Sequence, residues 1–325
     1  EYANTDVFIQ QLDMTPKNYS YFMEISCVIL LEIKGGMFLL NRVIDQFGLQ
    51  VQTISNVEDS HSSLVYKCTL LSVEHVFIKI PYTKLKWHRE FEAYEILKGH
   101  IAIPEMLDYW PGDEGCTGAF LLSELKGQPL TTEVSPTVAF QVGVLQATMH
   151  TIQPPVGKEL TSIQNEFPNW SHFIEKQFYS FAEDVRLVVD DCLYEKAILK
   201  FESMKHQLPP NDGPSFVHMD FRPANIIIDG NKVSGIIDFE SVRFGSTEID
   251  FIKLYRDFLR FDPTLYEAFQ EGYKSIRPLI NLEAVLPFYL FTDAFNSIGW
   301  AKRRGLNKNA LFLEENLARL KKFVE

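Results

Sequence analysis

The chain has 325 residues, of which 46% are hydrophobic and 23% are charged. This length exceeds what one hydrophobic core usually organises, so two lobes of unequal size are expected, and the composition excludes a disordered, collagen-like or coiled-coil protein. Lys and Arg number 31 against 43 Asp and Glu, a formal net charge of −12. This acidic excess argues against nucleic acid or an anionic membrane as a partner and favours a cationic small molecule.

The cysteines and the start of the chain bear on the compartment. The four cysteines lie far apart and form no C-x-x-C pair, so a zinc site is not indicated and a reducing compartment is expected. Residues 25–31 form an early apolar run, but Glu24 and Glu32 flank it and no basic leader precedes it, which is untypical of a signal peptide. The run is also too short to span a bilayer. A cytoplasmic protein is expected, and its oligomeric state is left open.

Residues 1–36 form an N-terminal extension with two interpretations. Lys34-Gly35-Gly36 could be a translated ribosome-binding site, in which case Met37 is the biological start. Alternatively, the extension is an extra element that packs on the first lobe. The intact mass of the natively expressed protein distinguishes the two.

Residues 37–126 are expected to form a small sheet with one prominent helix. Apolar residues at helical spacing follow Met37, and Gly48 is placed to end that first helix. Alternating and apolar runs, separated by turn residues, predict the strands. The predicted strands are 51–54, 64–70, 76–80, 104–110 and 119–125, and the prominent helix is 87–97.

Residues 127–325 are expected to be mainly helical. Helical spacing begins at 138–150 and resumes from Asp250 to the end. Between these segments, Phe216 begins a short strand, a polar loop follows, and a hairpin turns on Asp229-Gly230. The other predicted elements are helices at about 170–186 and 190–206 and hairpin strands at 226–228 and 233–237.

The loop between the short strand and the hairpin contains the most informative residues. Asp220 is followed five residues later by Asn225, and Asp238 lies thirteen residues further on. Phosphoryl transfer needs a carboxylate that orients and deprotonates an alcohol, and oxygen ligands for a Mg²⁺ ion that bridges the nucleotide phosphates. Asp220 can be the first group, and Asn225 with Asp238 can be the second.

With His218, these residues resemble the aminoglycoside phosphotransferase family, through the motif H-x-D-x-x-x-x-N and the segment Ile237-Asp238-Phe239-Glu240. That family shares its architecture with choline kinases and, more distantly, with protein kinases. The resemblance implies an α+β, two-lobed protein-kinase-like fold. A small N-lobe (37–126) with an antiparallel sheet and one helix would bind nucleotide, and a larger helical C-lobe (127–325) would carry the catalytic loop and the acceptor site.

The implied activity is a Mg²⁺-dependent O-phosphotransferase. It would move the γ-phosphate of ATP or GTP to a hydroxyl of an aminoglycoside-like or other small polar compound, with an Asp as catalytic base. The alternative is a pseudokinase that binds nucleotide or a partner without transferring phosphate. A metal-dependent hydrolase built on the same Asp residues is a third possibility, disfavoured because no His-rich or multi-carboxylate site lies nearby.

The resemblance also implies roles for single residues. Asp220 matches the catalytic base, and Arg222 is a candidate for binding the transferred phosphate, although a salt bridge to a nearby carboxylate is equally plausible. Lys79 matches the lysine that contacts the α- and β-phosphates. Glu90 matches the helix glutamate that orients this lysine, and Glu92 is its nearest rival.

The nucleotide-binding segments are less distinctive. Ser123 and Leu125 lie in a segment resembling the one that joins the lobes, whose backbone carbonyl and amide contact the purine edge. The phosphate-covering loop is expected at residues 58–63, where Ser62 is a candidate contact. This loop contains no glycine, because Gly48 and Gly99 bracket the whole stretch. Backbone amides and serine hydroxyls could still bind phosphate.

Three further residues have expected roles around the catalytic loop. By resemblance, His218 holds the loop backbone rather than acting as a base, and Asp250 braces the loop. Met219 replaces a glycine that is common after the histidine, which could alter the conformation of the loop.

Acceptor-binding residues are expected in the helical lobe. Acidic and aromatic side chains there would suit an amine through charge and cation–π contacts. The competing interpretation assigns the aromatic residues to the core and the charges to solvent, and it is favoured. The candidates are Phe178, Tyr179, Phe181, Asp184, Asp190, Asp293, Asn296, Trp300 and Arg304.

Overall fold

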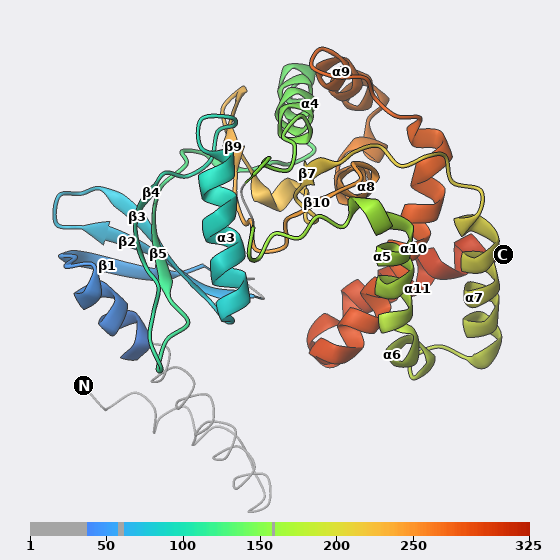
Figure 1. Ribbon diagram of the computed structural model, residues 1–325, viewed down its shortest axis with the longest axis horizontal. Helices are drawn as coiled ribbons and strands as arrows, with labels where there is room; N and C mark the ends of the chain where they lie inside the picture. Colours follow the sequence, from blue (N-terminus) through green and yellow to red (C-terminus); the bar gives the residue numbers. More distant parts are fainter. Residues whose placement is uncertain (1–37, 58–61, 158–159) are drawn as a thin grey trace, which may run out of the picture. The chain divides into compact units, whose positions relative to one another are not determined.

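A computed structural model describes residues 38–57, 62–157 and 160–325 (Figure 1). The fold is α+β, as predicted, with one five-stranded sheet followed by a mainly helical region. The contacts within the chain define two compact units: the first runs to Tyr82 and adds Leu107–Leu122, and the second holds Thr83–Met106 and Ser123–Glu325. The N-terminal extension and Met37 lie outside the described residues, as do residues 58–61 of the expected phosphate loop.

The first unit is built on an antiparallel sheet with the strand order β1-β2-β3-β5-β4. Residues 38–46 form the helix that was predicted to end at Gly48, and Gly48 adopts the positive φ of 61° that glycine tolerates best. Leu40 and Val43 of this helix pack into the sheet core around Ile78. The strands are β1 (Val51–Asn56), β2 (Ser63–Leu70), β3 (His75–Pro81), β4 (Met106–Trp110) and β5 (Ala119–Ser123).

The second unit is mainly helical. Helices α4 and α9 pack so closely that a Cβ at Gly143 would lie 2.2 Å from the carbonyl oxygen of Phe269, and one at Gly272 would lie 2.0 Å from that of Phe140. Glycine is therefore required at both positions. The helices are α3 (Lys84–Leu97), α4 (Pro136–His150), α5 (Trp170–Ser180), α6 (Ala182–Arg186), α7 (Asp191–Lys205), α8 (Glu248–Asp257), α9 (Pro263–Lys274), α10 (Leu282–Arg304) and α11 (Ala310–Val324).

Two small sheets in the second unit hold the loop that was singled out in the sequence. The predicted hairpin forms β8 and β9, and the short strand at Phe216 forms β7, which pairs with β10. Figure 1 shows β7, β10 and α8 side by side. The strands are β6 (Gln128–Pro129), β7 (Ser215–Val217), β8 (Ile226–Asp229), β9 (Lys232–Ile236) and β10 (Arg243–Gly245).

Helix α3 groups with the second unit, whereas the sequence resemblance assigns it to residues 37–126. The reason lies in its polar side chains. Arg89 donates to the carbonyl oxygen of Glu240 at 3.0 Å and to that of Ser162 at 3.3 Å. Lys86 forms a 3.0 Å ion pair with Glu240, and the Tyr94 ring packs edge-on against Phe239. These contacts attach α3 to the segment that directly follows Asp238.

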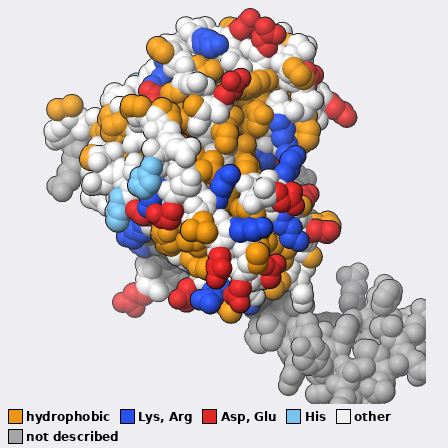
Figure 2. Space-filling view, turned by 90° about the vertical axis from the view of Figure 1, so that its right-hand side faces the viewer, with side chains coloured by type: hydrophobic (Ala, Val, Ile, Leu, Met, Phe, Trp, Pro, Cys, Tyr) orange, Lys and Arg blue, Asp and Glu red, His pale blue; other side chains and the backbone are white. Residues whose placement is uncertain are grey.

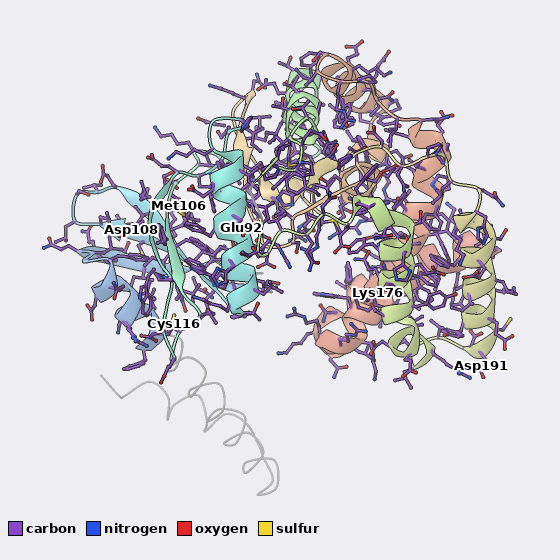
Figure 3. The ribbon with its side chains drawn as sticks, in the orientation of Figure 1. Glu92, Met106, Asp108, Cys116, Lys176 and Asp191 are labelled. Carbon is purple, nitrogen blue, oxygen red and sulfur yellow. The ribbon has the colours of Figure 1, made fainter. Side chains whose placement is uncertain are left out.

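Glu92, labelled on α3 in Figure 3, also attaches this helix to the second unit. Its carboxylate accepts from the backbone N–H and the hydroxyl of both Thr161 and Ser162, and from the N–H of Ile163, at distances of 2.6–3.1 Å. Burial alone would raise the pKa of Glu92, but these bonds to the Ser162 and Thr161 groups lower it to about 2. Glu92 therefore joins α3 to the loop at 161–163.

We expect Glu92→Gln to destabilise the protein by about 1–3 kcal/mol at pH 7, because an amide cannot accept this whole set of bonds. The folded-state pKa lies below the ordinary value of 4.5, so the contribution is complete above pH 4.5 and is lost as the pH falls towards 2. Chemical denaturation at several pH values measures this. Glu95→Gln, at an exposed position of the same helix, is the control. A stability difference that is independent of pH would contradict the assignment.

On the face shown in Figure 2, acidic and basic side chains are interspersed among hydrophobic ones. Among the residues that the structure describes, no helix is both long enough and apolar enough to span a membrane.

Candidate active site

The loop at residues 218–225 connects β7 to β8, and hydrogen bonds to α8 hold its backbone. Asp250, in the first turn of α8, accepts from the backbone N–H of His218 at 2.6 Å and from that of Met219 at 2.7 Å. The imidazole of His218 in turn contacts the carbonyl oxygen of Ile237 through Nε2 at 3.0 Å. The bracing role of Asp250 and the loop-holding role of His218 are thereby confirmed.

Asp250 is itself oriented by a buried network. Nε2 of His150 lies 3.2 Å from the Asp250 carboxylate, and Nδ1 lies 2.8 Å from the hydroxyl of Tyr273. Burial lowers the pKa of His150 despite the opposing effect of Asp250. A neutral ring satisfies both contacts when Nε2–H donates to Asp250 and Nδ1 accepts from Tyr273. This network fixes the carboxylate that supports the loop.

Met219 adopts a φ of 67°, a region that glycine occupies at little cost. Its N–H bond to Asp250 helps to hold it there. Met219 therefore takes a backbone conformation typical of glycine, at a local strain of about 1–3 kcal/mol.

Asp220 lies at the centre of a charged cluster. Its Oδ1 is 2.5 Å from Nζ of Lys253 on α8, and its Oδ2 is 3.3 Å from Nε of Arg222 and 3.2 Å from Nδ2 of Asn225. Burial would raise the pKa of Asp220, but the charges of Lys253 and Arg222 outweigh it and the pKa lies below its usual range. The carboxylate is therefore ionised at neutral pH and able to accept a proton.

Asn225 and Asp238 provide the oxygen donors that a Mg²⁺ ion prefers. Nδ2 of Asn225 donates to the backbone oxygen and the carboxylate of Asp220, which leaves its Oδ1 for another partner. Ile237, just before Asp238, donates its N–H to the carbonyl oxygen of Asn225 at 3.0 Å. Asp238 has a φ of 75°, a conformation kept where the surroundings impose it, often at functional sites. One amide oxygen and one carboxylate, with nucleotide phosphates, form a typical Mg²⁺ ligand set.

Across residues 38–57, 62–157 and 160–325, no group of three or more His, Cys, Asp or Glu is placed to hold a metal ion. Such a group is not needed for a Mg²⁺ ion that takes most of its ligands from phosphates and water.

The predicted phosphate-contacting residues fall in different units. Lys79 lies on β3, almost fully buried, opposite Val65 of β2. Glu90 is fully buried on α3, in the second unit. Their pairing stays a prediction. The Glu92 carboxylate accepts five hydrogen bonds within the second unit, which leaves Glu90 as the predicted partner of Lys79.

In the segment expected to contact the purine, the backbone N–H of Ser123 is already hydrogen-bonded within the chain. Ser123 donates its backbone N–H to the carbonyl oxygen of Glu105 at 2.9 Å, and its hydroxyl accepts from the N–H of Glu105 at 2.8 Å. The Ser123 N–H is therefore used within the chain, and Ser123 as a purine contact stays a prediction. Leu125 stays a prediction, as does Ser62, whose carbonyl oxygen accepts from the N–H of Tyr82.

Several expected acceptor-binding residues have structural roles. Phe178 is fully buried in a stack with Phe201 and Phe295, so it is core, as the favoured interpretation held. Asp190 caps the N-terminus of α7, accepting from the N–H of Leu193 at 2.9 Å. Other candidates contact neighbouring side chains: Tyr179 with Glu202, Asp184 and the Phe181 ring with Arg303, Asp293 with Arg256 and Arg319, and Trp300 with Arg304 and Phe312. Asn296 differs, because its Oδ1 is buried and has no hydrogen-bond partner among the described residues, so its role stays a prediction.

Lys253 is a site residue that the sequence interpretation missed. It lies one helical turn after Asp250, so both side chains point from the same face of α8 towards the loop. This i, i+3 spacing was the available signal.

The chain was compared with known proteins. Its sequence matches the phosphotransferase enzyme family (APH) over residues 53–288. It is 31% identical over 85 residues to a homoserine kinase of Neisseria meningitidis serogroup B and 35% identical over 80 residues to one of Gluconobacter oxydans. These matches cover 25% and 22% of this chain and only 28% and 24% of those two proteins.

Among solved structures, the chain resembles the GDP and kanamycin complex of APH(2")-IIia, with a TM-score of 0.70 and 15% identity over 88% of this chain and 98% of the other. It also resembles the macrolide 2'-phosphotransferase MphH of Brachybacterium faecium, with a TM-score of 0.64 and 16% identity over 87% and 97% of the two chains. These likenesses confirm the predicted kinase-like fold, and the family match spans most of the sequence. The chain belongs to the phosphotransferase enzyme family.

Proposed function

We propose that this protein is a small-molecule kinase that transfers the γ-phosphate of ATP or GTP to a hydroxyl of a small polar compound. The observation that carries the proposal is the arrangement of Asp220 beside Asn225 on a loop whose backbone Asp250 holds. The segment that leads to Asp238 is bonded to the same loop.

In the proposed mechanism, Asp220 accepts a hydrogen bond from the acceptor hydroxyl and takes its proton as the bond to phosphorus forms. Asn225 and Asp238 would hold Mg²⁺, which neutralises phosphate charge when it is bound. Arg222, which forms a 3.3 Å ion pair with Asp220, would bind the transferred phosphate, and Lys79, oriented by Glu90, would bind the other phosphates.

The nucleotide assignment is supported by structural relatives. APH(2")-IIia was solved with GDP and kanamycin, and the spectinomycin phosphotransferase APH(9)-Ia was solved with ADP and spectinomycin. We propose a nucleoside triphosphate with Mg²⁺ as co-substrate, and a cytoplasmic location where thiols stay reduced. Cys68, Cys116 and Cys192 are free thiols in the structure.

A turnover screen tests the proposal. Purified protein is incubated with ATP or GTP, with or without Mg²⁺, and with aminoglycosides, macrolides, hydroxy acids, sugars or choline-like amines. The expected result is nucleotide consumption that needs both Mg²⁺ and one acceptor class, with a phosphorylated product seen by mass spectrometry. Nucleotide binding without any acceptor-dependent turnover would instead favour the pseudokinase alternative.

A further inference from the structure

The two oxygens of the Asp220 carboxylate have different surroundings. Oδ2 contacts Asn225, the proposed Mg²⁺ ligand, and Arg222. It therefore faces the groups that would bind the nucleotide phosphate. Among the described residues, Oδ1 contacts Lys253 on α8. An acceptor whose hydroxyl contacts Asp220 would therefore lie close to the Lys253 ammonium.

Lys253 keeps the capacity to bind a ligand. Its ammonium has three donors, and 32% of its side chain is exposed. The single Asp220 carboxylate is shared between Lys253 and Arg222, so it does not fully neutralise the Lys253 ammonium, although the whole chain carries −12. A polycationic acceptor would be repelled here, whereas an anionic group would be attracted.

The carboxylates near the next charged residues of α8 do not create a binding site for a cationic acceptor. Arg256, one turn after Lys253, forms 2.6 Å ion pairs with both Asp257 and Asp293. Arg319 of α11 adds a 3.4 Å contact to Asp293. These two carboxylates are thus already neutralised by arginines and are poorly placed to bind the ammonium groups of an aminoglycoside.

We infer that Lys253 is a specificity-determining residue and that the acceptor is a hydroxy acid, whose carboxylate binds the Lys253 ammonium while its hydroxyl contacts Asp220. The transfer itself is unchanged: the alcohol oxygen bonds to the γ-phosphorus, the bond to the nucleoside diphosphate breaks, and the proton passes to Asp220. This inference rests on the proposed kinase function and names its substrate class.

The test uses matched acceptors and variants. L-homoserine, 4-hydroxybutyrate and D-glycerate are each compared with their uncharged carboxamides, and kanamycin serves as a polycation. The wild type should turn over a hydroxy acid better than its carboxamide. Lys253→Met should lower kcat/KM for the acid by roughly 10- to 100-fold, the effect of one charge-assisted hydrogen bond, mainly through KM. The ratio of acid to carboxamide should fall accordingly, and Lys253→Arg should restore part of it.

Lys274→Met, at an exposed position of α9, is the matched control. Equal losses for acid and carboxamide in Lys253→Met would overturn the inference, because Lys253 would then act only by positioning Asp220. Turnover of kanamycin but not of the hydroxy acids would overturn the inference and support the kinase function. No turnover of any acceptor would overturn both.

Discussion

Asp220→Asn should lower kcat by roughly 100- to 10,000-fold, the usual contribution of a general base. The amide keeps the size of the side chain but cannot take the proton of the acceptor hydroxyl. Nucleotide affinity should persist, because the bond from Asn225 to the backbone oxygen of residue 220 does not involve the substituted group. Steady-state kinetics with the acceptor found in the screen, together with calorimetric nucleotide binding, measure both quantities.

Asp229→Asn is the matched control for this variant. This control makes the same change from carboxylate to amide at Asp229, the exposed last residue of β8. It should retain full activity. An Asp220→Asn protein that keeps more than about a tenth of wild-type kcat would contradict the assignment of Asp220 as base, since even a modest general base contributes more than that.

Asp238→Asn should weaken the binding of Mg²⁺-nucleotide and lower kcat/KM by roughly 100-fold or more, because a metal ion supplies several kcal/mol of charge stabilisation in such a site. Asparagine is the better test than alanine, since φ at this residue is 75° and asparagine tolerates that region. A loss of function then reports the missing carboxylate rather than a strained backbone.

Titration of nucleotide with and without Mg²⁺ provides the readout. In the wild type, Mg²⁺ should increase nucleotide affinity, and in Asp238→Asn this increase should largely disappear. Circular dichroism establishes that the variant is folded. A folded Asp238→Asn protein that binds Mg²⁺-nucleotide as tightly as the wild type would exclude Asp238 as a metal ligand.

Much of the fold was predictable because its signals are local. Helical spacing and strand alternation gave the elements, and the spacing of Asp220, Asn225 and Asp238 placed the loop before the hairpin that returns to it. Backbone bonds of Ile237 bear out that return. The bracing by Asp250 followed from family resemblance rather than from any local pattern.

The remaining features depend on contacts between segments that are distant in sequence. The hydrogen bonds of Glu92 could not be predicted from spacing, because the donors that hold its carboxylate lie about 70 residues further along the chain. The position of the Lys253 ammonium beside Asp220 likewise depends on the packing of α8 against the loop at 218–225. The bonds between Ser123 and Glu105 could not be predicted either, because they form only when the end of β5 lies beside the residue that precedes β4.

The two units are interleaved along the chain, which limits how the protein can be divided into fragments. The polypeptide passes from one unit to the other three times, after Tyr82, after Met106 and after Leu122, so α3 is an excursion between two strands of the first unit's sheet. Neither unit is one contiguous piece. A fragment ending at Tyr82 would lack β4 and β5, and one beginning at Ser123 would lack α3 and leave the Glu240 carboxylate without Lys86. Division after Tyr82 therefore damages the first unit and division after Leu122 damages the second, and expression of either unit without segments of the other would require a relinked chain.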